Sequence, residues 1–200
     1  MAAVQWSKRA KILLFPLFML PLLLAILEFR SNPGEIETFL WKTGQWTIRF
    51  LIITLLISPL RQILKWNWLI TYRRPLGLTT FYYACVHLFG YSFINFGLDT
   101  SLILQDMLSS PYIIAGMIAF WLLIPLAITS TKRAIRRLGK YWRLLHRLIY
   151  VVAVLGIVHA LWHRLLTEYS PVDVIIYLVI IVALLGFRII NFFQKKQAKQ

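Results

Sequence analysis

Three histidines, His87, His146 and His159, lie in segments of the chain that are otherwise strongly apolar. His146 and His159 are thirteen residues apart. Thirteen residues of α-helix rise about 19.5 Å, so we expect these two imidazoles on roughly one face of their helix and near opposite sides of a membrane. Ionisable side chains cost free energy inside a bilayer and are therefore candidates for function. Because neutral imidazole is a strong ligand to iron, the three residues indicate metal coordination.

The elements that must position these histidines are membrane helices. Apolar residues make up 60% of the 200 residues and charged residues 14%, with a mean hydropathy of +0.71, which is typical of a polytopic membrane protein. The single cysteine, Cys85, cannot build a disulfide framework or a thiolate-bound cluster. A bundle of this size leaves no room for a separate nucleotide-binding domain, so an electron donor and an acceptor must be other molecules.

Six apolar windows of about 16 to 22 residues approach the ~20 residues that a membrane-spanning helix needs. They cover residues 12–27, 44–60, 75–96, 112–130, 144–165 and 172–190. The first window ends at Glu28 without a small-residue cleavage site, so we expect a membrane helix there and not a secretory signal. The sequence therefore predicts an all-α membrane protein, a bundle of six transmembrane helices. It shows no internal repeat.

Charged residues are divided between the connections. The N-terminus, residues 61–74, residues 131–143 and the C-terminal tail are rich in Lys and Arg and contain no acid, whereas every Asp and Glu falls in or beside the three other connections. The positive-inside rule therefore predicts that both termini are cytoplasmic and the acidic connections are outside. The net charge of +15 reflects this topology, and its basic rim suits anionic membrane lipid; we expect no nucleic-acid partner.

His87 and His159 lie at similar depth in the predicted bundle. His87 is about 18 Å along the third window from its cytoplasmic end, and His159 is displaced outward by a similar distance along the fifth. Two imidazoles at matching depth on two helices can bind one iron from both faces, which predicts heme b between these helices. The alternative is that the histidines only form interhelical hydrogen bonds. The absence of an acidic residue at mid-membrane, which a proton relay would need, favours heme.

The sequence leaves two alternatives for a second, inner site near His146. The positions thirteen and fourteen residues before His87 hold Arg74 and Arg73, where a four-histidine bundle with two hemes would have a second histidine. Protonated arginine is a poor iron ligand, but it suits heme propionates or a flavin phosphate. The inner cofactor is therefore either a heme held by His146 with an unusual second ligand or a different group. We expect His163 at the outer interface, and Arg49 either beside heme propionates or reaching that interface.

Three segments resemble the heme-binding membrane subunit of the bacterial periplasmic methionine sulfoxide reductase system, which belongs to the ferric-reductase-like transmembrane family. They are Arg73–Leu78 leading into Tyr82–His87, then Leu138–Tyr150, and finally Gly156–His159. The resemblance covers all six windows and implies a single ferric-reductase-like transmembrane domain over residues 1–200. It also implies that His87, His146 and His159 are the heme ligands. The second histidine that the wider ferric-reductase-like group has on its third span is absent here, and Arg73 is the candidate for its place.

The resemblance further implies an electron-transfer subunit of the bacterial inner membrane. Electrons would pass from the quinone pool or a cytoplasmic NAD(P)H flavin reductase, through one or two heme b groups, to a periplasmic molybdopterin subunit. That partner would carry out the catalysis and reduce methionine sulfoxide in oxidised proteins; FMN is left open as a further cofactor. Two alternatives remain: a cytochrome b subunit of another membrane oxidoreductase, such as a ferric reductase, and a small transporter without a cofactor.

Overall fold

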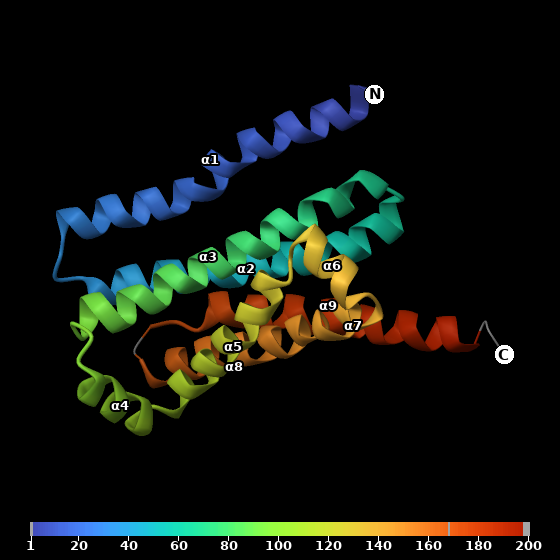
Figure 1. The fold of residues 1–200 in the computed structure, drawn as a ribbon. Helices are drawn as coiled ribbons and strands as arrows, with labels where there is room; N and C mark the ends of the chain where they lie inside the picture. The colour runs from blue at the N-terminus through green and yellow to red at the C-terminus, as the bar shows by residue number, and fades with distance from the viewer. Residues whose placement is uncertain (1, 168, 198–200) are drawn as a thin grey trace.

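The computed structural model describes residues 2–167 and 169–197, which form helices joined by short connections (Figure 1); within these ranges there is no strand. The all-α prediction is confirmed for this part of the chain. In chain order the elements are α1 (Ala2–Ser31), α2 (Ile36–Leu64), a 3₁₀ helix (Asn67–Tyr72), α3 (Arg73–Phe89), a π-helical segment (Gly90–Asn95), α4 (Thr100–Ser109), α5 (Pro111–Ile128), α6 (Lys132–Leu138), α7 (Lys140–Leu145), α8 (Leu148–Leu166) and α9 (Val172–Gln197).

Within the described part of the chain, four helical segments are long and apolar enough to cross a membrane: Ile36–Leu64, Pro111–Ile128, Lys140–Leu166 and Val172–Gln194. The third of these combines α7 and α8, whose helical course is interrupted at His146 and Arg147. The remaining two apolar windows also fall on helix, one within α1 and the other on α3 with the π-helical segment.

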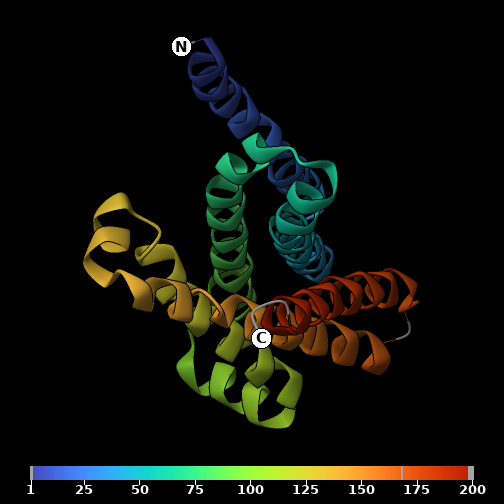
Figure 2. The same ribbon diagram turned by 90° about the vertical axis from the view of Figure 1, so that its right-hand side faces the viewer.

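The helices are arranged mainly as two pairs, α2 with α3 and α5 with α8, while α9 packs against both α8 and α2 (Figure 2). The principal core joins these elements through apolar residues such as Leu51, Leu55, Leu123, Val152 and Ile181. The α1–α2, α3–α5 and α8–α9 connections lie at one end of the molecule, and the basic α2–α3 and α5–α8 connections lie toward the other (Figure 1). Glu168, one of the acidic residues that the sequence assigns to an outer connection, lies outside the described ranges.

Tyr83 of α3 ties α1 to the bundle. Its side chain is 0% exposed, and its hydroxyl donates to the carbonyl oxygen of Phe18 at 2.7 Å and accepts from the Leu22 amide at 3.1 Å. In a regular helix the Phe18 carbonyl and the Leu22 amide would bond to each other. Because Pro16 and Pro21 lie inside α1 and disturb its backbone ladder, the tyrosine hydroxyl can satisfy both groups.

Candidate functional site

His87 projects from α3 toward α2. Its Nδ1 lies 2.9 Å from the carbonyl oxygen of Leu40, and its ring packs against Gly44, where a Cβ atom would lie 3.2 Å from Cε1. Thr43 places its hydroxyl 3.3 Å from the same Nδ1 and hydrogen-bonds the Phe39 and Leu40 carbonyls. A carbonyl oxygen can only accept, so Nδ1 carries the proton and Nε2 keeps a free lone pair.

His159 makes the same arrangement with another pair of helices. It projects from α8 toward α5, and its Nδ1 lies 2.8 Å from the carbonyl oxygen of Tyr112. A Cβ atom at Gly116 would lie 2.8 Å from that Nδ1, so only glycine leaves room for the ring in this position. The Nε2 of His159 is therefore also left free to bind a metal.

The two imidazoles meet although 72 residues separate them in the chain. Their ring centroids are 6.2 Å apart and their planes are inclined at 80°. A bond between a metal and an imidazole nitrogen is about 2 Å long and each centroid lies about 1 Å behind its nitrogen, so two rings on opposite sides of one metal have centroids about 6 Å apart. The separation of the His87 and His159 centroids matches that of two imidazoles bound to one metal ion.

A cavity of about 470 Å³ adjoins this pair, within the size range of cofactor sites. It is lined mainly by α2, α3, α5, α8 and α9, and its apolar lining includes Ile48, Leu51, Ala84, Leu123 and Val152. Among the described residues, no group of three or more His, Cys, Asp or Glu side chains could hold a bare metal ion. Two opposed imidazoles beside a large apolar cavity fit instead a metal whose remaining ligands belong to a macrocycle, as in heme.

Aromatic and polar side chains form the end of the cavity nearest the acidic connections. His163 stacks on Trp41 with ring centroids 6.2 Å apart, and it contacts Tyr112 edge-on at 5.3 Å. All three residues line the cavity, together with Glu37 and Asp106. His163 thus lies one helical turn beyond His159, at the rim of the cavity.

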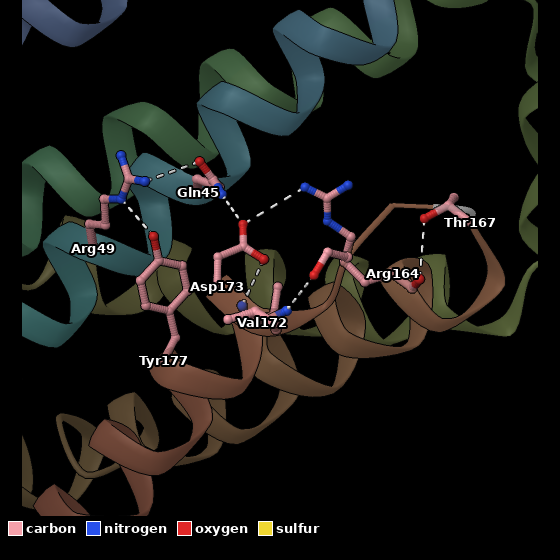
Figure 3. A network of polar contacts seen from close by, with 9 residues as sticks. Gln45, Arg49, Arg164, Thr167, Val172, Asp173 and Tyr177 are labelled. Carbon is pink, nitrogen blue, oxygen red and sulfur yellow. Dashed lines mark hydrogen bonds and ion pairs between the residues drawn. The ribbon is translucent and has the colours of Figure 1, made fainter.

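Behind this rim, a polar network joins α2 to α8 and α9 (Figure 3). Arg49 donates to the Tyr177 hydroxyl at 2.7 Å and to the Gln45 side chain at 3.1 Å, and Gln45 hydrogen-bonds Asp173. Asp173 also lies 3.8 Å from the guanidinium of Arg164. Both cavity-lining members, Gln45 and Tyr177, are thus held by their neighbours. Arg49 is engaged within the protein by these two side chains.

Arg164 is the most buried cation of the network, with a side chain 10% exposed. Its guanidinium carbon lies 3.3 Å from the ring centroid of Trp41 and 5.0 Å from that of Tyr169. Among the described residues its Nε has no hydrogen-bond partner, and the contacts that hold the cation there are the aromatic faces and Asp173. The sequence offered no signal for this arrangement, because Arg164, Asp173 and Trp41 come from three helices.

His146 lies apart from the other two candidate ligands. Its ring stacks on Trp142 with centroids 4.0 Å apart, and its Nε2 is 3.1 Å from the hydroxyl of Thr129, the residue that follows α5. It does not line the cavity between His87 and His159. Arg73 is half-buried and Arg74 exposed at the start of α3, and neither lines the cavity. The structure therefore brings together His87 and His159, and leaves His146, Arg73 and Arg74 outside that site.

The interruption before α8 explains where the ring of His146 points. An uninterrupted α-helix at 3.6 residues per turn would rotate by about 220° beyond whole turns over thirteen residues, so His146 and His159 would point to nearly opposite sides. Instead His159 contacts α5 near its start and His146 contacts Thr129 at its end. The break at His146 and Arg147 turns the inner ring back toward the same neighbour.

Sequence reasoning missed the backbone groups that orient the two candidate ligands, His87 and His159. Each histidine follows its carbonyl partner by 47 residues, Leu40 to His87 and Tyr112 to His159, and follows its glycine by 43. This shared spacing is present in the sequence. Two glycines and two histidines are nevertheless too few to stand out as a repeat, and a carbonyl partner can be any residue type.

Comparison with known proteins agrees with this architecture. A model of the family described as ferric reductase like transmembrane component matches residues 43–157, which include Gly44, His87, Gly116 and His146 and end two residues before His159. The match spans more than half of the chain.

Proteins named protein-methionine-sulfoxide reductase heme-binding subunit MsrQ are similar over most of the chain. The one from Azospira oryzae is 44% identical over 162 residues, which are 80% of this chain and 68% of the relative. The one from Herminiimonas arsenicoxydans is 48% identical over 68% of this chain and 62% of its own length. The one from Ralstonia nicotianae is 42% identical over 88% of this chain and 80% of its own length. The chain therefore belongs to the ferric reductase like transmembrane family and, within it, to the group of the MsrQ subunits.

Proposed function

We propose that this protein is a heme b electron-transfer subunit of a methionine sulfoxide reductase system. The observation that carries the proposal is the opposed pair His87 and His159, with ring centroids 6.2 Å apart and both Nδ1 atoms bound to backbone carbonyls. The relatives named as heme-binding subunits support the same cofactor.

His87 and His159 would hold the heme through their Nε2 atoms, one from each face. The heme would supply one-electron redox chemistry. The chain would contribute the imidazole nitrogens that hold the iron, a fixed orientation of both imidazoles, and apolar side chains around the cofactor. Gln45 and Tyr177 place polar atoms at the cavity wall and are themselves held by Arg49.

We place a single heme at this pair. A second heme on His146 would require its imidazole to leave the Thr129 hydroxyl and the face of Trp142. His146, with Arg73 and Arg74, instead belongs to the proposed entry side for electrons, where aromatic and basic side chains suit a quinone or the phosphate of FMN.

The proposed topology has six crossings of the bacterial inner membrane, with both termini cytoplasmic. In addition to the four segments of sufficient length and hydropathy, α1 and the α3 helix with its π-helical continuation would each cross once. The basic α2–α3 and α5–α7 connections would face the cytoplasm and the acidic connections the periplasm. The pair of His87 and His159, with its single heme, would then lie toward the periplasmic side, closer to an acceptor than to a donor.

The proposed acceptor is a periplasmic molybdopterin subunit that reduces methionine sulfoxide, and the proposed donor is a quinol or a cytoplasmic NAD(P)H flavin reductase. An absorbance scan of the purified protein with pyridine hemochrome quantification tests the core of the proposal. We expect a Soret band and about one heme b per chain. A colourless preparation from cells supplied with iron and heme precursors would refute it.

Co-purification distinguishes the remaining alternative. A cytochrome b subunit of a ferric reductase would use the same heme site without a molybdenum partner. Retention of a molybdenum protein on the tagged subunit supports the proposed partner, whereas ferric reduction by the isolated subunit with no such protein bound favours the alternative.

A further inference from the structure

The two candidate heme ligands are oriented by one recurring backbone device. In each case the imidazole Nδ1 bonds a helix carbonyl, Leu40 or Tyr112, and the residue four positions later is a glycine, Gly44 or Gly116. A helix carbonyl points toward the residue four positions later, so a Cβ at the glycine would lie close to an imidazole that bonds this carbonyl. A Cβ at Gly44 would lie 3.2 Å from the nearest atom of the His87 ring, and a Cβ at Gly116 would lie 2.8 Å from the nearest atom of the His159 ring.

The device constrains rotation as well as position. The Nδ1 bond fixes one point of each ring, and contact with the bare glycine backbone limits how the ring can turn about that bond. A helix carbonyl already accepts from the amide four residues later and has a second lone pair for the imidazole. Because the two anchors are on different helices, α2 and α5, the two ring planes are set independently, and they lie 80° apart.

We propose that Gly44 and Gly116 are positioning residues that hold the planes of the His87 and His159 imidazoles nearly perpendicular to one another about the metal. This inference rests on the proposed heme between the two histidines. In low-spin ferric heme, perpendicular axial imidazole planes leave two of the iron d orbitals nearly equal in energy and produce a single large-g electron paramagnetic resonance line. Near-parallel planes produce a rhombic three-line spectrum.

Substitution by alanine should have a larger effect at Gly116 than at Gly44. An alanine Cβ at position 116 would approach Nδ1 of His159 to 2.8 Å, which requires the ring to shift and disturbs its bond to Tyr112. At position 44 the closest ring atom is 3.2 Å away, so a displacement of a few tenths of an ångström relieves the contact. Gly186 of α9 offers a matched control, because a Cβ there meets no atom within 4 Å.

The test is low-temperature electron paramagnetic resonance of the full-length ferric protein, with heme content measured by pyridine hemochrome. We expect the large-g line in the unsubstituted protein and in Gly186→Ala. Gly116→Ala should lose that line and gain rhombic intensity or high-spin intensity, and Gly44→Ala should show a smaller change of the same kind. If Gly116→Ala purifies without heme, the spectrum of Gly44→Ala alone tests whether the glycines set the imidazole planes.

Two results would overturn the inference while leaving the heme site intact. One is a rhombic spectrum from unsubstituted protein with its full heme content. The other is a spectrum of Gly44→Ala and Gly116→Ala that matches that of Gly186→Ala. Unsubstituted protein without heme would instead refute the proposed function itself.

Discussion

His159 of α8 and His87 of α3 face each other with ring centroids 6.2 Å apart, and each is bound through Nδ1 to a carbonyl that lies 47 residues earlier in the chain. The site is therefore made by two helix pairs, α2 with α3 and α5 with α8, each of which supplies one oriented imidazole. Four predictions about individual residues follow from this arrangement and from the contacts around it.

The first concerns the ligand pair. His87→Ala and His159→Ala should each abolish the low-spin spectrum, because one remaining imidazole leaves the opposite face of the iron without its ligand. Optical and paramagnetic resonance spectra of the purified variants measure this. His163→Ala is the matched control and should keep the spectrum, since His163 lies at the cavity rim against Trp41 and Tyr112. Intact bis-imidazole bands in both ligand variants would rule out the assignment.

The second concerns electron entry. His146→Ala should keep the spectrum of the heme, because His146 lies outside the cavity, with its Nε2 on Thr129. Reduction by a quinol or reduced flavin should become about tenfold slower or more, the scale expected when a group beside a redox site is removed. Stopped-flow reduction of the variant measures the rate. Complete loss of heme from this variant would contradict the separation of the two histidine sites.

The third concerns the attachment of α1. Tyr83→Phe removes the hydroxyl that serves both the Phe18 carbonyl and the Leu22 amide, and should lower the free energy of unfolding by about 1–2 kcal/mol. Tyr82→Phe, at the neighbouring exposed tyrosine, provides the control and should change stability little. Denaturant titration in detergent measures both. Equal stability of the two variants would show that the buried hydroxyl does not hold α1.

The fourth concerns the outer polar network. Asp173→Asn keeps an acceptor for the Val174 amide but removes the negative charge beside Arg164, whose side chain is 10% exposed. Leaving a nearly buried guanidinium without its charge partner should cost about 1–3 kcal/mol. The comparison is Glu28→Gln, which breaks a more exposed ion pair: the side chain of Glu28 is 46% exposed and that of its partner Lys42 is 38% exposed. This substitution should cost about 0–1 kcal/mol. A cost for Asp173→Asn no greater than that for Glu28→Gln would argue against a structural role of the network.

The sequence by itself determined the class of this protein and its candidate ligands. Long apolar windows and the segregation of basic from acidic connections are local properties of the chain, so the helices could be placed from residue types alone. Histidines inside such windows can also be recognised from residue type alone, because few other residues there can bind a metal. The short helices α4, α6 and α7 were not anticipated, since their windows are too short or too polar for the same criterion.

Only the tertiary structure decided which histidines meet. Helical spacing sets the depth of His87, His146 and His159, but the direction of each ring depends on how its helix is rotated against its neighbours, which packing determines. The break at His146 and Arg147 changes that rotation within a single apolar window. Helix packing likewise creates the bonds of the two histidines to the Leu40 and Tyr112 carbonyls and their close approach to Gly44 and Gly116. It also brings Arg164 against Trp41 and Asp173. Each joins residues from different helices, so each exists only once those helices have packed.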